Sequence, residues 1–168
     1  STIGETKLSS IVSTAIDNYS FRFSDHKIEV WNNCEGNTLK AYLAEPETIS
    51  MITNLLDNSI FWLCYARKDQ RKISIYITDQ IKEYNSIIIS DNGPGFNIPT
   101  EVAIQPFITG KPHNIGMGLG LHIVNEMMRA MKGQLLFLDQ DEVVLPETVR
   151  QNKIDKAIIA LCFPKEKK

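Results

Sequence analysis

The fold of this 168-residue chain is decided by three short stretches, Asn54-Leu55-Leu56-Asp57-Asn58, Asp91-Asn92-Gly93-Pro94-Gly95-Phe96 and Gly116-Met117-Gly118-Leu119-Gly120-Leu121. The first lies inside a helical pattern of apolar residues, and the second directly follows an apolar run that is typical of a buried strand. The third opens another helical pattern. Each stretch alone is weak, but their order along one chain predicts that they surround a single pocket.

Composition bounds the possible answers. The chain is 43% hydrophobic and 23% charged, which is typical of an ordinary globular protein, and we expect residues 1–168 to form a single domain. Its formal net charge of -2 gives no electrostatic reason to expect nucleic acid or an anionic membrane as a partner. No apolar run reaches the roughly 18 residues of a membrane span, so we expect no membrane contact within this chain.

Three cysteines, Cys34, Cys64 and Cys162, are scattered along the chain without a CxxC pair. This usage predicts reduced thiols in a cytoplasmic compartment. Cys64 and Cys162 lie in apolar runs, so we expect both to be buried. The chain begins with Ser1 rather than Met, and we expect it to be a piece of a longer protein.

Hydrophobic periodicity predicts alternating helices and strands. Helices are expected at 8–16, from Pro46 to about Tyr65, and at 119–132 with Gly133 as the stop; strands are expected at 27–31, 38–44, 73–78, 87–89, 135–138 and 157–161. The continuous run 87–89 predicts a central strand that is covered on both faces. Residues 97–115 form a long loop with three prolines, which is usually functional or disordered, and 139–156 is a polar excursion.

Asn54 and Asn58 are four residues apart, so a helix places them on one face, which also carries Met51 and Phe61. Buried amides need hydrogen-bond partners. One interpretation is that the two side chains cap loops or meet solvent. The other is that Asn58 offers its carbonyl oxygen to Mg²⁺, which takes few protein oxygens and lets phosphates supply the rest.

Asp91 is delivered by the apolar strand to the edge of the core. An ionised Asp only accepts hydrogen bonds, and the amino group of adenine is a suitable donor. Gly93 and Gly95 allow the backbone to approach a flat base closely. A plain turn remains the alternative, because Asn-Gly and Pro-Gly are common turn dipeptides.

Gly116-x-Gly118-x-Gly120 opens a helix, where backbone N–H groups attract anions and glycine lets phosphate come near. The spacing differs from the dinucleotide-binding GxGxxG, and a glycine-rich hinge without a ligand is the alternative. In the preceding loop, Phe107 is a candidate hydrophobic latch and Lys111 a candidate phosphate contact. His122 is expected to be a partly buried surface residue, and no metal site of His and Cys is predicted.

These motifs, in this order, resemble the boxes of the GHKL ATPase superfamily, which includes histidine kinases, gyrase B, mismatch-repair ATPases and heat-shock chaperones. The stretches 54–58, 91–96, 106–111 and 116–121 are similar to the N, first glycine, F and second glycine boxes of histidine kinases. The resemblance spans residues 27–163. It implies the Bergerat fold, an α+β two-layer sandwich with a mixed, mostly antiparallel sheet, helices on one face and an ATP lid over residues 97–115.

The resemblance also implies a site for ATP and Mg²⁺. Asn58 is the implied metal ligand, and Asp91 is implied to bind the adenine amine. The implied nucleotide-contacting residues, drawn from all four boxes, are Asn54, Asn58, Asp91, Gly93, Gly95, Phe107, Thr109, Lys111, Gly116, Gly118, Leu119, Gly120 and Leu121. Among these, Asn54 and Lys111 are the residues expected to act in catalysis.

Two departures from the family pattern matter. Hydrolytic relatives carry Glu one turn before the metal Asn, whereas this chain has Asn54, and an amide does not accept a proton usefully at neutral pH. We therefore expect slow hydrolysis and transfer of the γ-phosphoryl group to an acceptor. Many histidine kinases also place Lys or Arg three residues after the metal Asn, where this chain has Phe61, and Lys111 is the candidate replacement.

The leading hypothesis is thus a protein histidine kinase domain in two-component signalling. Its acceptor histidine would lie on dimerisation helices outside this chain, a response regulator would act downstream, and a dimer is expected only in the full-length protein. Two alternatives stay open: a conformational ATPase of the same fold, and a degenerate nucleotide-binding module without catalysis. Asn54 argues against the first, and Phe61 keeps the second open.

Overall fold

A computed structural model describes residues 2–66, 69–95, 101, 104–105, 120–139 and 157–168 of the chain. Its elements, in chain order, are β1 (Gly4–Lys7), α1 (Leu8–Asp25), β2 (Ile28–Asn32), β3 (Lys40–Leu43), α2 (Glu45–Tyr65), β4 (Arg71–Thr78), β5 (Tyr84–Asp91), α4 (Gly120–Ala130), β6 (Gln134–Phe137) and β7 (Ala157–Pro164). In these residues no helix is both long enough and apolar enough to cross a bilayer.

The described strands form two sheets. The larger has the order β2-β4-β5-β7-β6, with β2 parallel to β4 and all other neighbours antiparallel. β1 and β3 form a separate antiparallel pair. The predicted mixed, mostly antiparallel sheet is therefore confirmed, and β5 lies at its centre.

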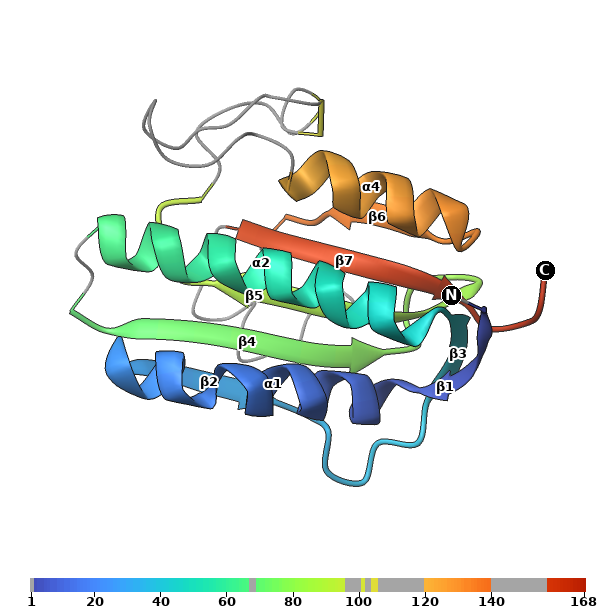
Figure 1. Cartoon of the computed structure of the whole chain (residues 1–168), viewed down its shortest axis with the longest axis horizontal. Helices are drawn as coiled ribbons and strands as arrows, with labels where there is room; N and C mark the ends of the chain where they lie inside the picture. Colours follow the sequence, from blue (N-terminus) through green and yellow to red (C-terminus); the bar gives the residue numbers. More distant parts are fainter. Residues whose placement is uncertain (1, 67–68, 96–100, 102–103, 106–119, 140–156) are drawn as a thin grey trace.

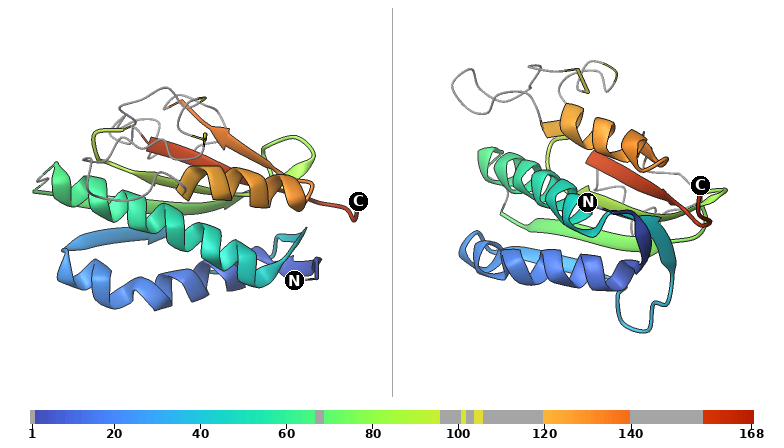
Figure 2. Two further views of the ribbon diagram at one scale, coloured as in Figure 1. Left: turned by 45° about the horizontal axis from the view of Figure 1, so that its top comes forward. Right: turned by 45° about the vertical axis from the view of Figure 1, so that its right-hand side comes forward.

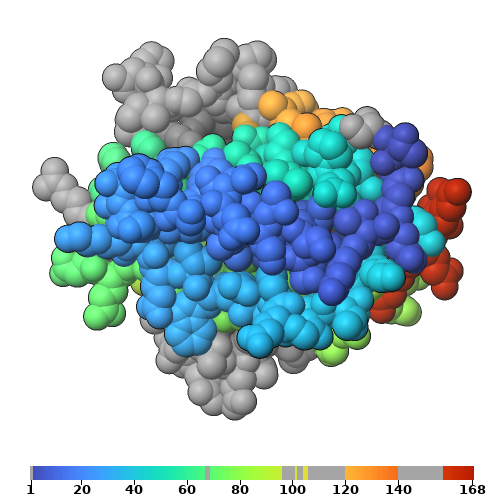
Figure 3. Space-filling view, turned by 60° about the horizontal axis from the view of Figure 1, so that its bottom comes forward, coloured from blue at the N-terminus to red at the C-terminus, as the bar shows by residue number. Residues whose placement is uncertain are grey.

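The helices α1, α2 and α4 lie side by side over one face of the larger sheet, with α2 in the middle (Figures 1 and 2). Seen from below, α1 crosses the molecule between α2 and the segment that carries β2 and β3 (Figure 3). This arrangement is the predicted two-layer sandwich. It gives α2 two neighbouring seams, one with α1 and one with α4.

Helix α1 runs to Asp25, well beyond the predicted end at Ile16. The extension follows from Tyr19 and Phe23, which continue the buried stripe of Leu8, Ile11, Val12 and Ala15. An amphipathic helix gains stability wherever this stripe can pack on the core. The helix ends at His26, and the next residue, Lys27, has a positive φ of 54° that turns the chain into β2.

Alternation along the central strands explains the two-sided core. Ile87 and Ile89 of β5 belong to the large cluster beneath the helices, whereas Ile88 belongs to a second cluster with Tyr76, Ile158, Ala160 and Cys162. Successive strand residues point to opposite faces. The prediction that residues 87–89 form a strand buried on both faces is confirmed.

Candidate functional site

The site begins where β5 ends. Asp91 is the last residue of this central strand, and only 4% of its surface is exposed. It pairs across the sheet with Ile73 of β4 and Ala157 of β7. A buried carboxylate is costly unless hydrogen bonds compensate for lost hydration. The contacts of its two oxygen atoms therefore decide what this residue can do.

Each carboxylate oxygen of Asp91 accepts a hydrogen bond. Ser59 on α2 donates its hydroxyl to Oδ2 at 2.8 Å, and the backbone N–H of Gly93 donates to Oδ1 at 2.9 Å. A Cβ atom on Gly93 would lie 2.8 Å from Oδ1 and 3.6 Å from Cδ2 of Leu63. Only glycine therefore lets the backbone come this close to the carboxylate. Gly95, two residues on, has a positive φ of 84° that also suits glycine.

Asn92 anchors the turn between these residues. Its side chain accepts a hydrogen bond from the N–H of Lys72 at 2.8 Å and donates one to the carbonyl of Gln70 at 2.9 Å. Its own N–H donates to the carbonyl of Lys72 at 3.2 Å. The Asn-Gly turn after Asp91 is thus tied to the start of β4, which holds Asp91 in place.

The second part of the site comes from α2 and α4. Asn54 and Asn58 are half-buried on α2, and a Cβ on Gly120, the first residue of α4, would lie 3.8 Å from Nδ2 of Asn58. Within the described residues neither amide side chain has a hydrogen-bond partner. The first N–H groups of a helix also lack partners within it. The Asn58 side chain therefore lies beside the start of α4.

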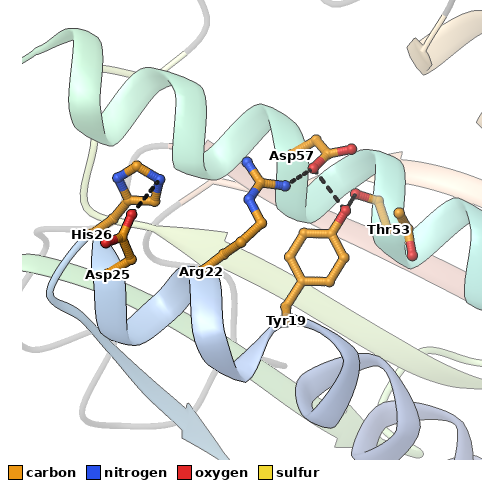
Figure 4. Close-up of polar contacts among 6 residues, drawn as sticks. All are labelled: Tyr19, Arg22, Asp25, His26, Thr53 and Asp57. Atoms are coloured by element: carbon orange, nitrogen blue, oxygen red, sulfur yellow. Dashed lines mark hydrogen bonds and ion pairs between the residues drawn. The ribbon is translucent and has the colours of Figure 1, made fainter.

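Asp57, next to Asn58 in sequence, serves the opposite seam. It accepts a hydrogen bond from the Tyr19 hydroxyl at 2.7 Å and forms an ion pair with Arg22, both on α1 (Figure 4). The Tyr19 hydroxyl also lies 3.5 Å from the carbonyl oxygen of Thr53. Burial, reinforced by Asp57, raises the pKa of Tyr19 to about 12. This cluster fixes α2 against α1 and leaves Asn58 facing α4.

Three aromatic side chains close the end of α2 beyond Asn58. Phe61 stacks on Tyr65 with ring centroids 5.7 Å apart, and Trp62 meets both rings edge to face. Tyr65 is 58% exposed. Phe61, at the position where many histidine kinases carry Lys or Arg, is therefore part of an aromatic stack and brings no positive charge.

Several predicted site residues lie outside the described part of the chain. These are Phe107, Thr109, Lys111, Gly116, Gly118 and Leu119, together with nearly all of the predicted lid. Of the second glycine stretch, Gly120 and Leu121 are described and begin α4. His122 is half-buried, as expected, and its Nδ1 lies 3.1 Å from the carbonyl oxygen of Ile104.

The described residues place Asn58 beside Gly120 at the start of α4, and they connect Asp91 to Gly93 and to Ser59, the neighbour of Asn58 on α2. They contain no group of three or more His, Cys, Asp or Glu side chains that could hold a metal. A metal ion here would be bound by the amide oxygen of Asn58 and by oxygens of a bound phosphate group. Mg²⁺ is the ion that suits such a site, because it takes few protein ligands. Ser59 and Asn92 were not predicted to be part of the site. The available signal for Ser59 was its polar side chain on the apolar stripe of α2.

The thiols behave mostly as expected. Cys162 is fully buried in β7, and burial raises the pKa of its thiol. Cys64, which was expected to be buried, is only half-buried. It lies on the α1 side of α2, where its Sγ is 3.5 Å from Nδ1 of His26.

Comparison with known proteins identifies the family of this two-layer domain. Residues 44–165 match the family described as histidine kinase-, DNA gyrase B- and HSP90-like ATPases. This match covers more than half of the chain. The chain belongs to this family.

Individual relatives agree with the family. The C4-dicarboxylate transport sensor protein DctB of Pseudomonas aeruginosa is 30% identical over 109 residues, which are 64% of this chain and 18% of that protein. The catalytic domain of histidine kinase ThkA has a TM-score of 0.74 at 18% identity, over 98% of this chain and 99% of that one. The mycobacterial sensor histidine kinase MprB has a TM-score of 0.70 at 19% identity, over 97% of each chain. The chain thus spans about a fifth of the curated relative and nearly all of these structures.

Proposed function

We propose that this chain is the ATP- and Mg²⁺-binding catalytic domain of a sensor histidine kinase. The observation that carries the proposal is the buried carboxylate of Asp91, which faces away from bulk solvent with both oxygens accepting hydrogen bonds. A carboxylate in this state only accepts, so a base with an exocyclic amine suits it. Asn58 and the start of α4, which lie beside each other, would take the phosphates of such a nucleotide.

The residues divide the work of binding between two ends of the nucleotide. Asp91, Gly93 and Gly95 would hold the base. Asn58 would hold Mg²⁺ through its carbonyl oxygen, with Gly116, Gly118, Leu119, Gly120 and Leu121 around the phosphates. When bound, Mg²⁺ would neutralise charge on the phosphates. Phe107, Thr109 and Lys111 of the lid would cover the site, exclude water and supply a point charge.

The proposed reaction is transfer of the γ-phosphoryl group to an imidazole nitrogen. The bond from the γ-phosphorus to the bridging oxygen breaks, the bond to the nitrogen forms, and ADP leaves. Such transfers depend on positioning more than on covalent help from the protein. Asn54 stands one helical turn before Asn58, where hydrolytic relatives carry Glu, and its amide does not take up a proton at neutral pH. Water attack is therefore slow, which preserves the γ-phosphoryl group for the acceptor.

The acceptor would be a histidine on helical dimerisation segments outside this chain, and a response regulator would receive the signal. The full-length protein would be the dimer. We also propose that the domain acts on the cytoplasmic side of a larger sensor. Support for these partners is the similarity to a sensor protein and to histidine kinase domains.

A second candidate is a nucleotide-binding module without catalysis. Phe61 favours it, because this residue stands where many histidine kinases carry Lys or Arg and its ring stacks on Tyr65. Without that charge, phosphate contacts rest more heavily on Lys111 and on the start of α4. Such a module would bind Mg-ATP without transferring phosphate.

Two measurements separate the candidates. Calorimetry with ATP and Mg²⁺ measures binding to this chain, and labelled γ-phosphate measures transfer within the full-length protein that contains it. A kinase binds ATP and labels a histidine. A degenerate module binds without labelling, and rapid hydrolysis that depends on Asp91 would indicate a conformational ATPase. No binding at all would overturn the proposal.

Replacing Asn54 by Glu sharpens this test. Asn54 is half-buried, so a glutamate can be accommodated, and its carboxylate adds the missing proton acceptor. We expect the hydrolysis rate to rise roughly 100-fold, because general-base assistance is typically worth that much. Asn18→Glu on the exposed face of α1 is the matched control and should leave hydrolysis unchanged. An unchanged rate in Asn54→Glu would contradict the proposed role of Asn54.

A further inference from the structure

Ser59 occupies a place that the binding scheme above does not explain. It follows Asn58 on α2, only 6% of its surface is exposed, and its hydroxyl donates to Oδ2 of Asp91 at 2.8 Å. A hydroxyl in the core is costly unless it is paired, and here its partner is the carboxylate of the proposed base site. The inference drawn from it rests on the proposed function.

The two donors on Asp91 differ in one property. The Gly93 N–H can only donate, and it reaches Oδ1 at 2.9 Å. The Ser59 hydroxyl can donate or accept, because its hydrogen rotates. Together they bind one oxygen each, so a rotation of the carboxylate would strain both hydrogen bonds. Removing the Ser59 hydroxyl would take the side-chain donor away from Oδ2 and leave the Gly93 N–H on Oδ1.

The state of this carboxylate decides which purine fits. A charged, oriented carboxylate accepts from the 6-amino group of adenine and repels the 6-carbonyl oxygen of hypoxanthine or guanine. A carboxyl group that can turn and carry a proton can donate to that carbonyl instead. Sites that match one hydrogen-bonding pattern reject the other because a buried group stays unpaired.

We propose that Ser59 is a specificity-determining positioning residue: its hydroxyl holds Asp91 as an oriented acceptor, so that the site takes a 6-aminopurine nucleotide and rejects a 6-oxopurine nucleotide. Helix α2 then controls both ends of the ligand from consecutive residues. Ser59 faces β5 and acts on the base through Asp91, whereas Asn58 faces α4 and the phosphates.

The test compares ATP with ITP, which differs at the 6-position and lacks the additional 2-amino group of GTP. Calorimetry with Mg²⁺ gives the ratio of the two dissociation constants for each variant of the chain. For Ser59→Ala we expect the preference for ATP to fall roughly tenfold, the typical value of one hydrogen bond to a buried charge. A residue with a merely structural role would weaken both nucleotides equally and leave the ratio unchanged.

The chain offers a matched control. Ser74 of β4 is fully buried, and in the described structure its hydroxyl has no hydrogen-bond partner. Ser74→Ala removes the same group from the core without touching Asp91, and it should keep the wild-type ratio. Ser59→Cys keeps a side chain of similar shape with a weaker donor, so its ratio should lie between those of wild type and Ser59→Ala.

The outcomes separate this inference from the proposed function. If the wild-type chain binds ATP and Ser59→Ala keeps the wild-type ratio, the inference is wrong and the proposed function stands. If Ser59→Ala does not fold, Ser59→Cys decides in the same way. If the wild-type chain binds neither nucleotide, both fail.

Discussion

The two seams of helix α2 differ in how their polar groups are satisfied. On the α1 side, Asp57, Tyr19 and Arg22 form a cluster whose partners all lie within the fold (Figure 4). On the α4 side, the amides of Asn54 and Asn58 have no such partners among the described residues. Asp57 and Asn58 are consecutive, so one turn of helix joins α1 on one side and, on the other, carries the amide that the proposed function assigns to a ligand.

This difference shows where stability and function can be separated. The α1 seam is made of groups that mainly stabilise the fold, and a ligand would not change their partners. The α4 seam and the end of β5 hold the groups that the proposed function assigns to the nucleotide. Substitutions in the first region should therefore change the free energy of unfolding, and those in the second should change nucleotide binding.

The sharpest test removes one aspartate from each region and compares the effects. Asp91→Ala should weaken ATP binding about 100-fold or more, because it removes the charged acceptor and leaves the donors Ser59 and Gly93 unpaired. Asp57→Ala should leave the dissociation constant within about twofold but lower the free energy of unfolding by about 1 kcal/mol, since its ion pair is half-exposed. Calorimetry and urea unfolding measure the two effects, and the reverse assignment would break the comparison.

The metal side of the site is tested by Asn58→Ala. Loss of the amide oxygen should raise the Mg²⁺ concentration needed for half-maximal ATP binding roughly tenfold, because Mg²⁺ takes few protein ligands. Asn18→Ala on the exposed surface of α1 is the control and should have no effect. A titration with Mg²⁺ at fixed ATP measures the shift. Equal Mg²⁺ dependence in both variants would remove Asn58 from the proposed metal site.

Much of the fold could be predicted because its signals are local. The amphipathic stripe predicted helix α2. The apolar run Ile87–Ile89 predicted strand β5 and its burial on both faces. Two features were missed. β1 has the polar sequence Gly-Glu-Thr-Lys and becomes a strand only through pairing with β3. Helix α1 was predicted too short because the buried apolar residues of its second half, Tyr19 and Phe23, are more widely spaced than those of its first half.

The residues of the candidate site could be proposed for the same reason. Asn58, Asp91 and Gly93 lie in short motifs, and the structure joins Gly93 to Asp91 by a hydrogen bond and places Asn58 beside Gly120. The residues that hold them were not predicted. Ser59 reaches Asp91 across 32 positions, and Arg22 and Tyr19 reach Asp57 across 35 and 38 positions. Contacts at such separations depend on how helices pack, which no local pattern records.

Glycine substitutions give a smaller effect that still separates the two kinds of region. Gly93→Ala places a Cβ 2.8 Å from Oδ1 of Asp91, which must move, so ATP binding should weaken by about tenfold. Gly4→Ala has nothing within 4 Å and should leave binding unchanged. Calorimetry on both variants measures this, and equal affinities would show that the carboxylate tolerates displacement.

The last expected effect is a pH dependence that belongs to the α1 seam alone. The pKa of Tyr19 is raised to about 12 by burial and by Asp57, against an ordinary value of 10.0. The unfolded chain therefore loses this proton first, so the stabilisation is complete below pH 10 and is lost as pH rises toward 12. Tyr19→Phe lacks this proton. Between these pH values the wild type should lose stability relative to Tyr19→Phe by at most about 1.4 kcal/mol per pH unit. Urea unfolding of both proteins across this range measures the difference, and parallel pH profiles would show that the Tyr19 hydroxyl is not held by this seam.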